Sequence, residues 1–161
     1  MSDDQKRQLH DYLTKTREAV IWKAEGLPEY EVRRPLTRTG TNLLGLVKHL
    51  SIDAGPALRG DLQPPVRTAS AVVGRRCARR CRYVWVAASE DRREILGTYE
   101  AATAHADETI RSLDLDALGH VPWWRRPNVT LHAVLVHVVT ETARHAGHAD
   151  SLRAPQCVRT A

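Results

Sequence analysis

The sequence predicts an all-α protein in which four helices form an antiparallel bundle. Four long segments place apolar residues at steps of three and four, the periodicity of an amphipathic helix. No segment shows the sustained apolar and polar alternation of a half-buried strand. The chain has 161 residues, of which 42% are hydrophobic and 27% charged, so we expect residues 1–161 to form a single globular domain.

Capping and helix-breaking residues delimit the first two predicted helices. A periodic segment from about Asp4 to Glu25 is stopped by the Gly-Leu-Pro sequence at 26–28. An extended connector at 33–37 follows. A second helix is then predicted to start near Asn42, an amide cap, and to carry His49 in its third turn.

The last two helices are predicted in the second half of the chain. Ser89 can cap a helix that ends near Leu113, with acidic residues in its first turn. A loop at 114–127 leads to Asn128 and Thr130, either of which can cap a final helix from about Leu131 to Arg153.

An arginine-rich segment at 55–83 interrupts this pattern. It contains seven arginines and one acid, a local charge of +6 within a chain of net charge +5, so the remainder is nearly neutral. Its prolines and the lack of amphipathic periodicity predict a long loop. We assign no role to Cys77, Cys81 and Cys157. Three is an odd number of cysteines, and their spacing is not that of a zinc ribbon or a thioredoxin motif.

Charge and hydropathy also bear on partners and location. The N-terminal residues form no apolar leader, and no stretch approaches the length of apolar sequence that a membrane span requires, so we expect a cytoplasmic protein without a membrane partner. The cluster at 75–82 lacks the interleaved aromatic residues of a nucleic-acid surface, and the sequence therefore does not favour nucleic acid as a partner. The sequence leaves open whether the protein forms a homodimer.

One face of the fourth predicted helix combines apolar and metal-binding side chains. Steps of four and three place six residues in one stripe: Val134, Val138, Glu141, His145, His148 and Leu152. Burying a carboxylate beside imidazoles without a compensating charge is costly, so this stripe either faces water or holds a cation.

A divalent metal ion would satisfy the second alternative. Glu141 and His145, one turn apart, can direct an oxygen and a nitrogen to one ion, and His49 can add a nitrogen from the second helix. His148 and His137 are further candidate ligands. This mixed ligation fits Zn, Ni, Fe, Mn or Co. The residues alone leave open that Glu141 and His145 form a surface pair and that His49 is a core histidine.

Three segments carry motifs of a known family. They are TGTNLLGLVKHL at 39–50, VPWW at 121–124, and a segment at 130–150 that contains ETARHAGHAD. Together they resemble the DinB/YfiT-like superfamily, and more narrowly its actinobacterial mini-circle-protein branch. The resemblance implies a four-helix bundle of that type, with a metal held by the residues that match its motif, namely His49, Glu141 and His145.

The resemblance also implies an activity. Some members of the superfamily are S-transferases, and one is a maleylpyruvate isomerase, that use mycothiol, bacillithiol or glutathione and whose metal binds and activates the thiol. The resemblance therefore implies a metal-dependent thiol S-transferase acting on a small-molecule thiol such as mycothiol and an electrophile. The alternative is a non-enzymatic, stress-linked metal-binding protein.

Two segments depart from the family pattern, namely 55–83 and the tail at 154–161. The abrupt loss and return of the pattern suggests the hypothesis of compensating frameshifts in a GC-rich gene. The net charge and the cysteines would then be consequences of the frameshifts, and activity would be impaired although the ligands survive. Sequencing of the coding DNA tests this hypothesis, which fails if no alternative frame restores the family pattern across 55–83.

Overall fold

The computed structural model describes residues 2–35, 37, 40–58 and 85–157, and it is mostly helical. The elements in chain order are α1 (Ser2–Ala24), α2 (Glu29–Arg33), α3 (Leu43–Leu58), α4 (Arg92–Ser112), β1 (Leu118–His120), β2 (Asn128–Thr130) and α5 (Leu131–Cys157). The four predicted helices are therefore present as α1, α3, α4 and α5. Most of the arginine-rich segment, with Cys77 and Cys81, lies outside the described residues, as does the end of the tail.

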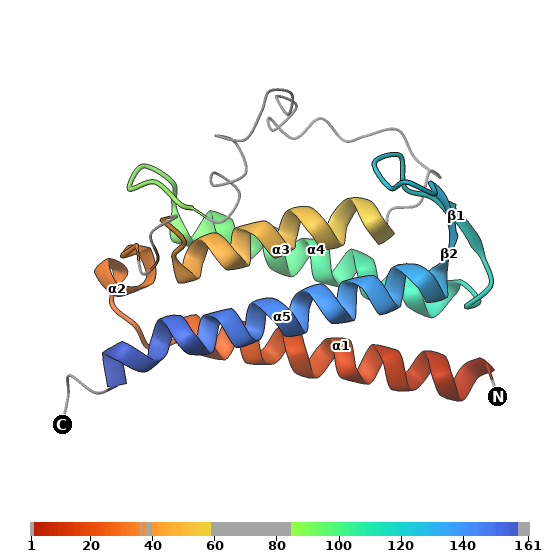
Figure 1. Cartoon of the computed structure of the whole chain (residues 1–161), viewed down its shortest axis with the longest axis horizontal. Coiled ribbons are helices and arrows are strands. Elements are labelled where there is room, and N and C mark those ends of the chain that lie inside the picture. The colour runs from red at the N-terminus through yellow and green to blue at the C-terminus, as the bar shows by residue number, and fades with distance from the viewer. Residues whose placement is uncertain (1, 36, 38–39, 59–84, 158–161) are drawn as a thin grey trace.

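The four long helices lie side by side in two pairs (Figure 1). Helix α1 packs mainly on α5, α4 packs mainly on α3, and the pairs meet chiefly where α3 packs on α5. Figure 1 shows α1 and α5 running in one direction and α3 and α4 in the other. The expected antiparallel arrangement is therefore found between the pairs and is wrong within them. The physical reason is the long connection between α3 and α4, which can return the chain along the whole length of a helix.

A small hairpin that the sequence analysis missed fixes the start of α5. Strands β1 and β2 pair antiparallel, with Gly119 opposite Val129. The first two main-chain N–H groups of α5 donate to the carbonyls of Ala117 and Leu115, each at 2.9 Å. The hydroxyl of Thr130 accepts a hydrogen bond from the third amide of α5 at 3.3 Å. Of the two candidates, Thr130 and not Asn128 therefore caps this helix.

The buried amide of Asn42 anchors the start of α3. Its Oδ1 accepts a hydrogen bond from the Gly45 amide at 2.7 Å, which confirms the predicted cap. Its Nδ2 donates to the carbonyl of Arg33 at 2.9 Å and to that of Val86 at 3.5 Å. One side chain thus ties the first turn of α3 to the end of α2 and to the segment that precedes α4.

The sequence analysis missed one short helix and assigned one cap wrongly. Helix α2 forms just ahead of the predicted extended connector, with a backbone turn in which Val32 N–H donates to the carbonyl of Pro28. Helix α4 is capped by Asp91 and not by Ser89, because the Asp91 carboxylate accepts hydrogen bonds from the amides of Arg93 and Glu94. Both a serine and an aspartate are good caps, and spacing alone did not separate them.

Two helices also extend beyond their predicted ends. Helix α3 continues through Pro56 to Leu58, and α5 continues into the divergent tail as far as Cys157. Pro56 lies in the last turn of α3, so the predicted loop begins later than position 55.

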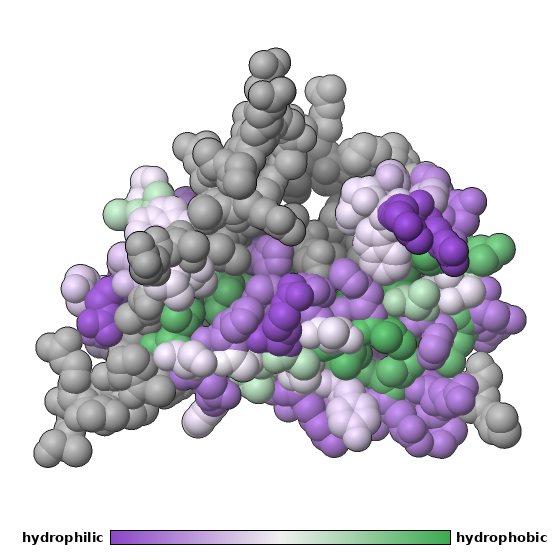
Figure 2. All heavy atoms as spheres, viewed as in Figure 1, coloured by the Kyte–Doolittle hydropathy of each residue, from purple (hydrophilic) through white to green (hydrophobic). Residues whose placement is uncertain are grey.

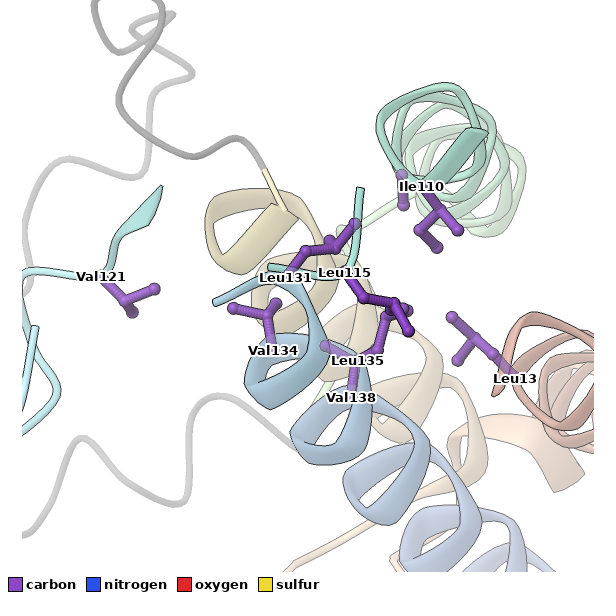
Figure 3. Packing of buried hydrophobic residues seen from close by; sticks show 9 residues of the cluster. Leu13, Ile110, Leu115, Val121, Leu131, Val134, Leu135 and Val138 are labelled. Carbon is purple, nitrogen blue, oxygen red and sulfur yellow. The ribbon is translucent and has the colours of Figure 1, made fainter. Parts of the chain in front are cut away.

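The hydrophobic core joins both helix pairs. Figure 3 shows one cluster in which Leu13 of α1 and Ile110 of α4 meet Leu135 and Val138 of α5. A second cluster joins α1, α2, α3 and α4 around Val20, and a third links α3 to α5. Burying each aliphatic side chain of this size contributes about 1.5–3 kcal/mol, so these contacts determine how the helices pair.

The outer face that α1 and α5 present is mainly hydrophilic, with hydrophobic side chains exposed near the start of α5 (Figure 2). Within the part of the chain that the structure describes, none of the helices is both long and apolar enough to cross a membrane.

The Asn42 amide gives the first testable prediction. Replacing Asn42 with Ala removes the cap of α3 and leaves buried main-chain groups without partners, so we expect the free energy of unfolding to fall by about 2–3 kcal/mol. Urea denaturation measures this loss. Asn128→Ala is the matched control, because that amide is exposed and its substitution should cost less than about 0.5 kcal/mol. Equal losses in the two variants would contradict the anchoring role.

Candidate metal centre

Helix α3 places His49 at its interface with α5. The flanking residues Leu46, Val47 and Leu50 are buried, whereas His49 is half-buried. The neighbouring Lys48 forms an ion pair with Glu90, which also accepts a hydrogen bond from the Ala87 amide at 2.9 Å. Burial raises the pKa of Glu90, but the hydrogen bonds from Lys48 and Ala87 outweigh this and lower it overall. Glu90 is thus held as a carboxylate that fixes the rotation of α3.

Helix α5 brings Glu141 and His145 to the same place. His145 is 6% exposed, and the Glu141 side chain one turn earlier is 16% exposed. The rings of His49 and His145 lie edge to face, with centroids 4.7 Å apart. One potential ligand atom from each of His49, Glu141 and His145 lies within 4.8 Å of the other two. The structure therefore brings together the three residues that the sequence singled out.

One atom of this group, a ring nitrogen of His145, is left unsatisfied. Nε2 of His145 is buried and has no hydrogen-bond partner among the described residues. It lies 3.6 Å from Oε2 of Glu141, too far for a hydrogen bond. Native proteins rarely leave a buried polar atom unpaired, so this nitrogen calls for an additional group.

The protonation state of His145 suits a ligand. Burial, together with the nearby side chains of His49, Arg144 and His148, lowers its pKa from 6.5 to about 4, although Glu141 acts in the opposite direction. At neutral pH the imidazole is therefore uncharged and retains a lone pair on one nitrogen. A metal ion requires a neutral imidazole of this kind.

The donor set fits a divalent metal ion. Two imidazoles and one carboxylate are the ligands of many three-residue sites for first-row metals, and such sites keep positions open for other molecules. A cation would pair with the orphan nitrogen of His145 and with the charge of Glu141. The same donors suit Zn, Ni, Fe, Mn and Co.

The two further candidate ligands lie beside this group. His148 is exposed, and its Nδ1 lies 3.4 Å from Nδ1 of His145. The ring of His137 packs edge to face against Trp124, with centroids 4.7 Å apart. Within the described residues, the three-residue group that can share an ion includes neither of them.

Arg144 is a neighbour of the site that the sequence analysis missed. Its guanidinium forms an ion pair with Oε2 of Glu141, and its side chain is 55% exposed. The acid–base spacing of three residues on one helix could have indicated this pair. Because the pair is partly exposed, we expect it to orient Glu141 more than to stabilise the fold.

Comparison with protein families gives a match over most of the chain. A family model described as "MST: Mycothiol-S-transferase" matches residues 8–155 of the chain. No curated protein matches the chain.

The lowered pKa of His145 predicts how stability depends on pH in protein treated with a chelator. Below pH 6.5 the unfolded chain takes up a proton that the folded chain does not bind until about pH 4, so stability falls as the pH falls through this range. Between pH 7 and pH 5 this group should account for about 2 kcal/mol of the loss, measured by urea denaturation. His145→Leu should remove that part of the pH dependence, and His105→Leu, at an exposed position of α4, should retain it. The same loss in His145→Leu as in the parent protein would refute the assignment.

Proposed function

The chain belongs to the mycothiol S-transferase family, a DinB/YfiT-like family, and on that premise we propose that it is a metal-dependent thiol S-transferase. In the proposed reaction the sulfur of a low-molecular-weight thiol of the mycothiol type loses its proton to water and forms a bond to an electrophilic carbon, from which a leaving group such as chloride departs with the bonding electrons. The observation that carries the proposal is the convergence of His49, Glu141 and His145, with a buried unpaired nitrogen at its centre.

We assign each of these side chains a part in holding the ion. His49 and His145 would each provide one ring nitrogen, and Glu141 would provide a carboxylate oxygen and its negative charge. Arg144 orients that carboxylate from the outer side through the ion pair between them. A divalent cation held by these groups lowers the pKa of a bound thiol, which supplies the thiolate that S-transfer requires at neutral pH.

The remaining features of the proposal concern the architecture around the site. We interpret the four long helices as the four-helix bundle of the DinB/YfiT-like type, with the ligands on the interface between its two pairs. We also propose a cytoplasmic location, because low-molecular-weight thiols are maintained in the reduced state there.

Metal analysis tests the ligand assignment. Protein purified without chelator should contain close to one divalent ion per chain by elemental analysis, and His145→Ala or Glu141→Gln should lose most of it, since a three-ligand site reduced to two binds weakly. His132→Ala is the control, because this histidine lies on the same helix but is exposed and outside the group. A correctly folded parent protein that binds none of the five candidate metals would refute the metal site.

An activity assay tests the reaction. With mycothiol and a reactive electrophile such as a monochlorobimane, the metal-loaded protein should consume the thiol faster than the uncatalysed reaction, and chelation should abolish the difference. Returning the native metal should restore it. Stoichiometric metal without any thiol consumption over a panel of thiols and electrophiles would instead support the alternative of a non-enzymatic metal-binding protein.

A further inference from the structure

A groove separates α1 from α4 on a different interface from the candidate metal centre. Its volume is about 490 Å³, and its walls are formed by one face of α1 between Thr14 and Glu25 and one face of α4 between Tyr99 and Asp107. Helix α1 packs mainly on α5, and α4 packs mainly on α3. The groove borders the apolar cluster that α1 and α4 share around Val20, to which its lining residue Tyr99 belongs.

Polar contacts hold the two helices at both ends of the groove. At one end Asp107 accepts hydrogen bonds from Nη1 of Arg17 at 2.6 Å and from the ring of His10 at 3.0 Å. At the other end Arg92 donates to the carbonyls of Ala24 and Leu27, each at 3.0 Å. These contacts fix the spacing of α1 and α4, so the groove is a built feature of the fold.

Two hydrogen-bonding groups that line this groove have no partner among the described residues. Nη2 of Arg17 and the hydroxyl of Tyr99 are both buried, in side chains whose residues are 8% and 4% exposed. Both can donate a hydrogen bond, and leaving such donors unpaired in the interior is unfavourable. An oxygen acceptor supplied by a ligand would satisfy them.

The rim of the groove is acidic. Glu18, Glu25 and Glu100 line it and are exposed, and none forms an ion pair with another residue in the described ranges. This local excess of carboxylates disfavours anions and attracts organic cations, although the chain as a whole carries a net charge of +5.

An aromatic ring adds a surface for a cation. Trp22 lines the groove and is 57% exposed, and the ammonium group of Lys23 lies 4.3 Å from the centre of its ring. One cation, the Lys23 ammonium, thus already lies over this indole. Ile21 beside it contributes an apolar wall for the carbon chain of a ligand.

From these features we propose that the groove between α1 and α4 is a second binding site, which takes a small organic amine that also carries an oxygen acceptor. The ammonium group lies among Glu18, Glu25 and Glu100 at the rim. The oxygen accepts hydrogen bonds from Arg17 and Tyr99, and the carbon chain between them contacts Ile21. This site does not depend on the metal centre or on the transferase activity.

An NMR titration of the metal-loaded protein with 5-amino-1-pentanol tests the proposal. We expect saturable shifts of amide signals in residues 14–25 and 99–107. 1,5-Pentanediol, which lacks the charge, and pentanoate, which carries the opposite charge, should produce no saturable shifts in these residues. Shifts of equal size with all three compounds, saturable shifts confined to other residues, or no saturable shift with the amine would each overturn the proposal.

Two variants separate the acidic rim from the buried donors. Glu100→Gln should weaken binding of 5-amino-1-pentanol by about threefold or more, whereas Glu108→Gln, on the same helix but outside the groove, should not. The parent protein should bind 5-amino-1-pentanol about threefold or more tightly than pentylamine, the value of at least one hydrogen bond, and Tyr99→Phe should reduce that preference because only Arg17 then donates to the oxygen. Tyr12→Phe, at an exposed position of α1, is its control. A preference of unchanged size in folded Tyr99→Phe would show that the hydroxyl does not receive the ligand.

Discussion

The packing of α3 against α5 is the contact on which the candidate metal centre depends. An apolar cluster joins Leu43 and Leu46 of α3 to Ala149 and Leu152 of α5, directly beside the point where His49 meets His145. Apolar packing is non-directional, so it brings the helices together without fixing their rotation. The directional contacts are those of Asn42 at the start of α3 and of Lys48 with Glu90. Together they set which face of α3 reaches α5.

Burial positions His145, and it also makes the imidazole energetically unfavourable when no ligand is bound to its buried nitrogen. Its imidazole is removed from water, is surrounded by positive or potentially positive groups and has an unpaired buried nitrogen. A metal ion would relieve these costs together, because it replaces the missing hydrogen bond and pairs with Glu141. Stability and ligand affinity are therefore coupled at this position, as expected where a fold keeps polar groups buried for a function.

Helical periodicity predicted much of this candidate site because two of its three candidate ligands lie one turn apart on one helix. The spacing of Glu141 and His145 required no tertiary information, and the choice of His49 relied on its place among apolar residues and on family resemblance. The three-residue hairpin strands are too short to show alternation, and α2 is too short to show periodicity. The relative directions of the helices depend on how residues 59–91 return the chain, which local pattern does not encode. Arg144 was missed although its spacing of three residues from Glu141 could have indicated the pair, because the prediction considered metal-binding residue types and not their charged neighbours.

The buried side-chain atoms that lack hydrogen-bond partners are concentrated at a few places in the helix arrangement. Within the described residues these atoms belong to Arg17, Glu31, Arg34, Tyr99 and His145. Glu31 and Arg34 form an ion pair with each other at 3.3 Å, so their charges are compensated locally. The remaining three atoms lie at two places, namely His145 at the interface of the helix pairs and Arg17 with Tyr99 in the groove between α1 and α4. Apolar clusters hold the helices together both within and between the pairs, and these three unpaired polar atoms lie where one pair faces the other.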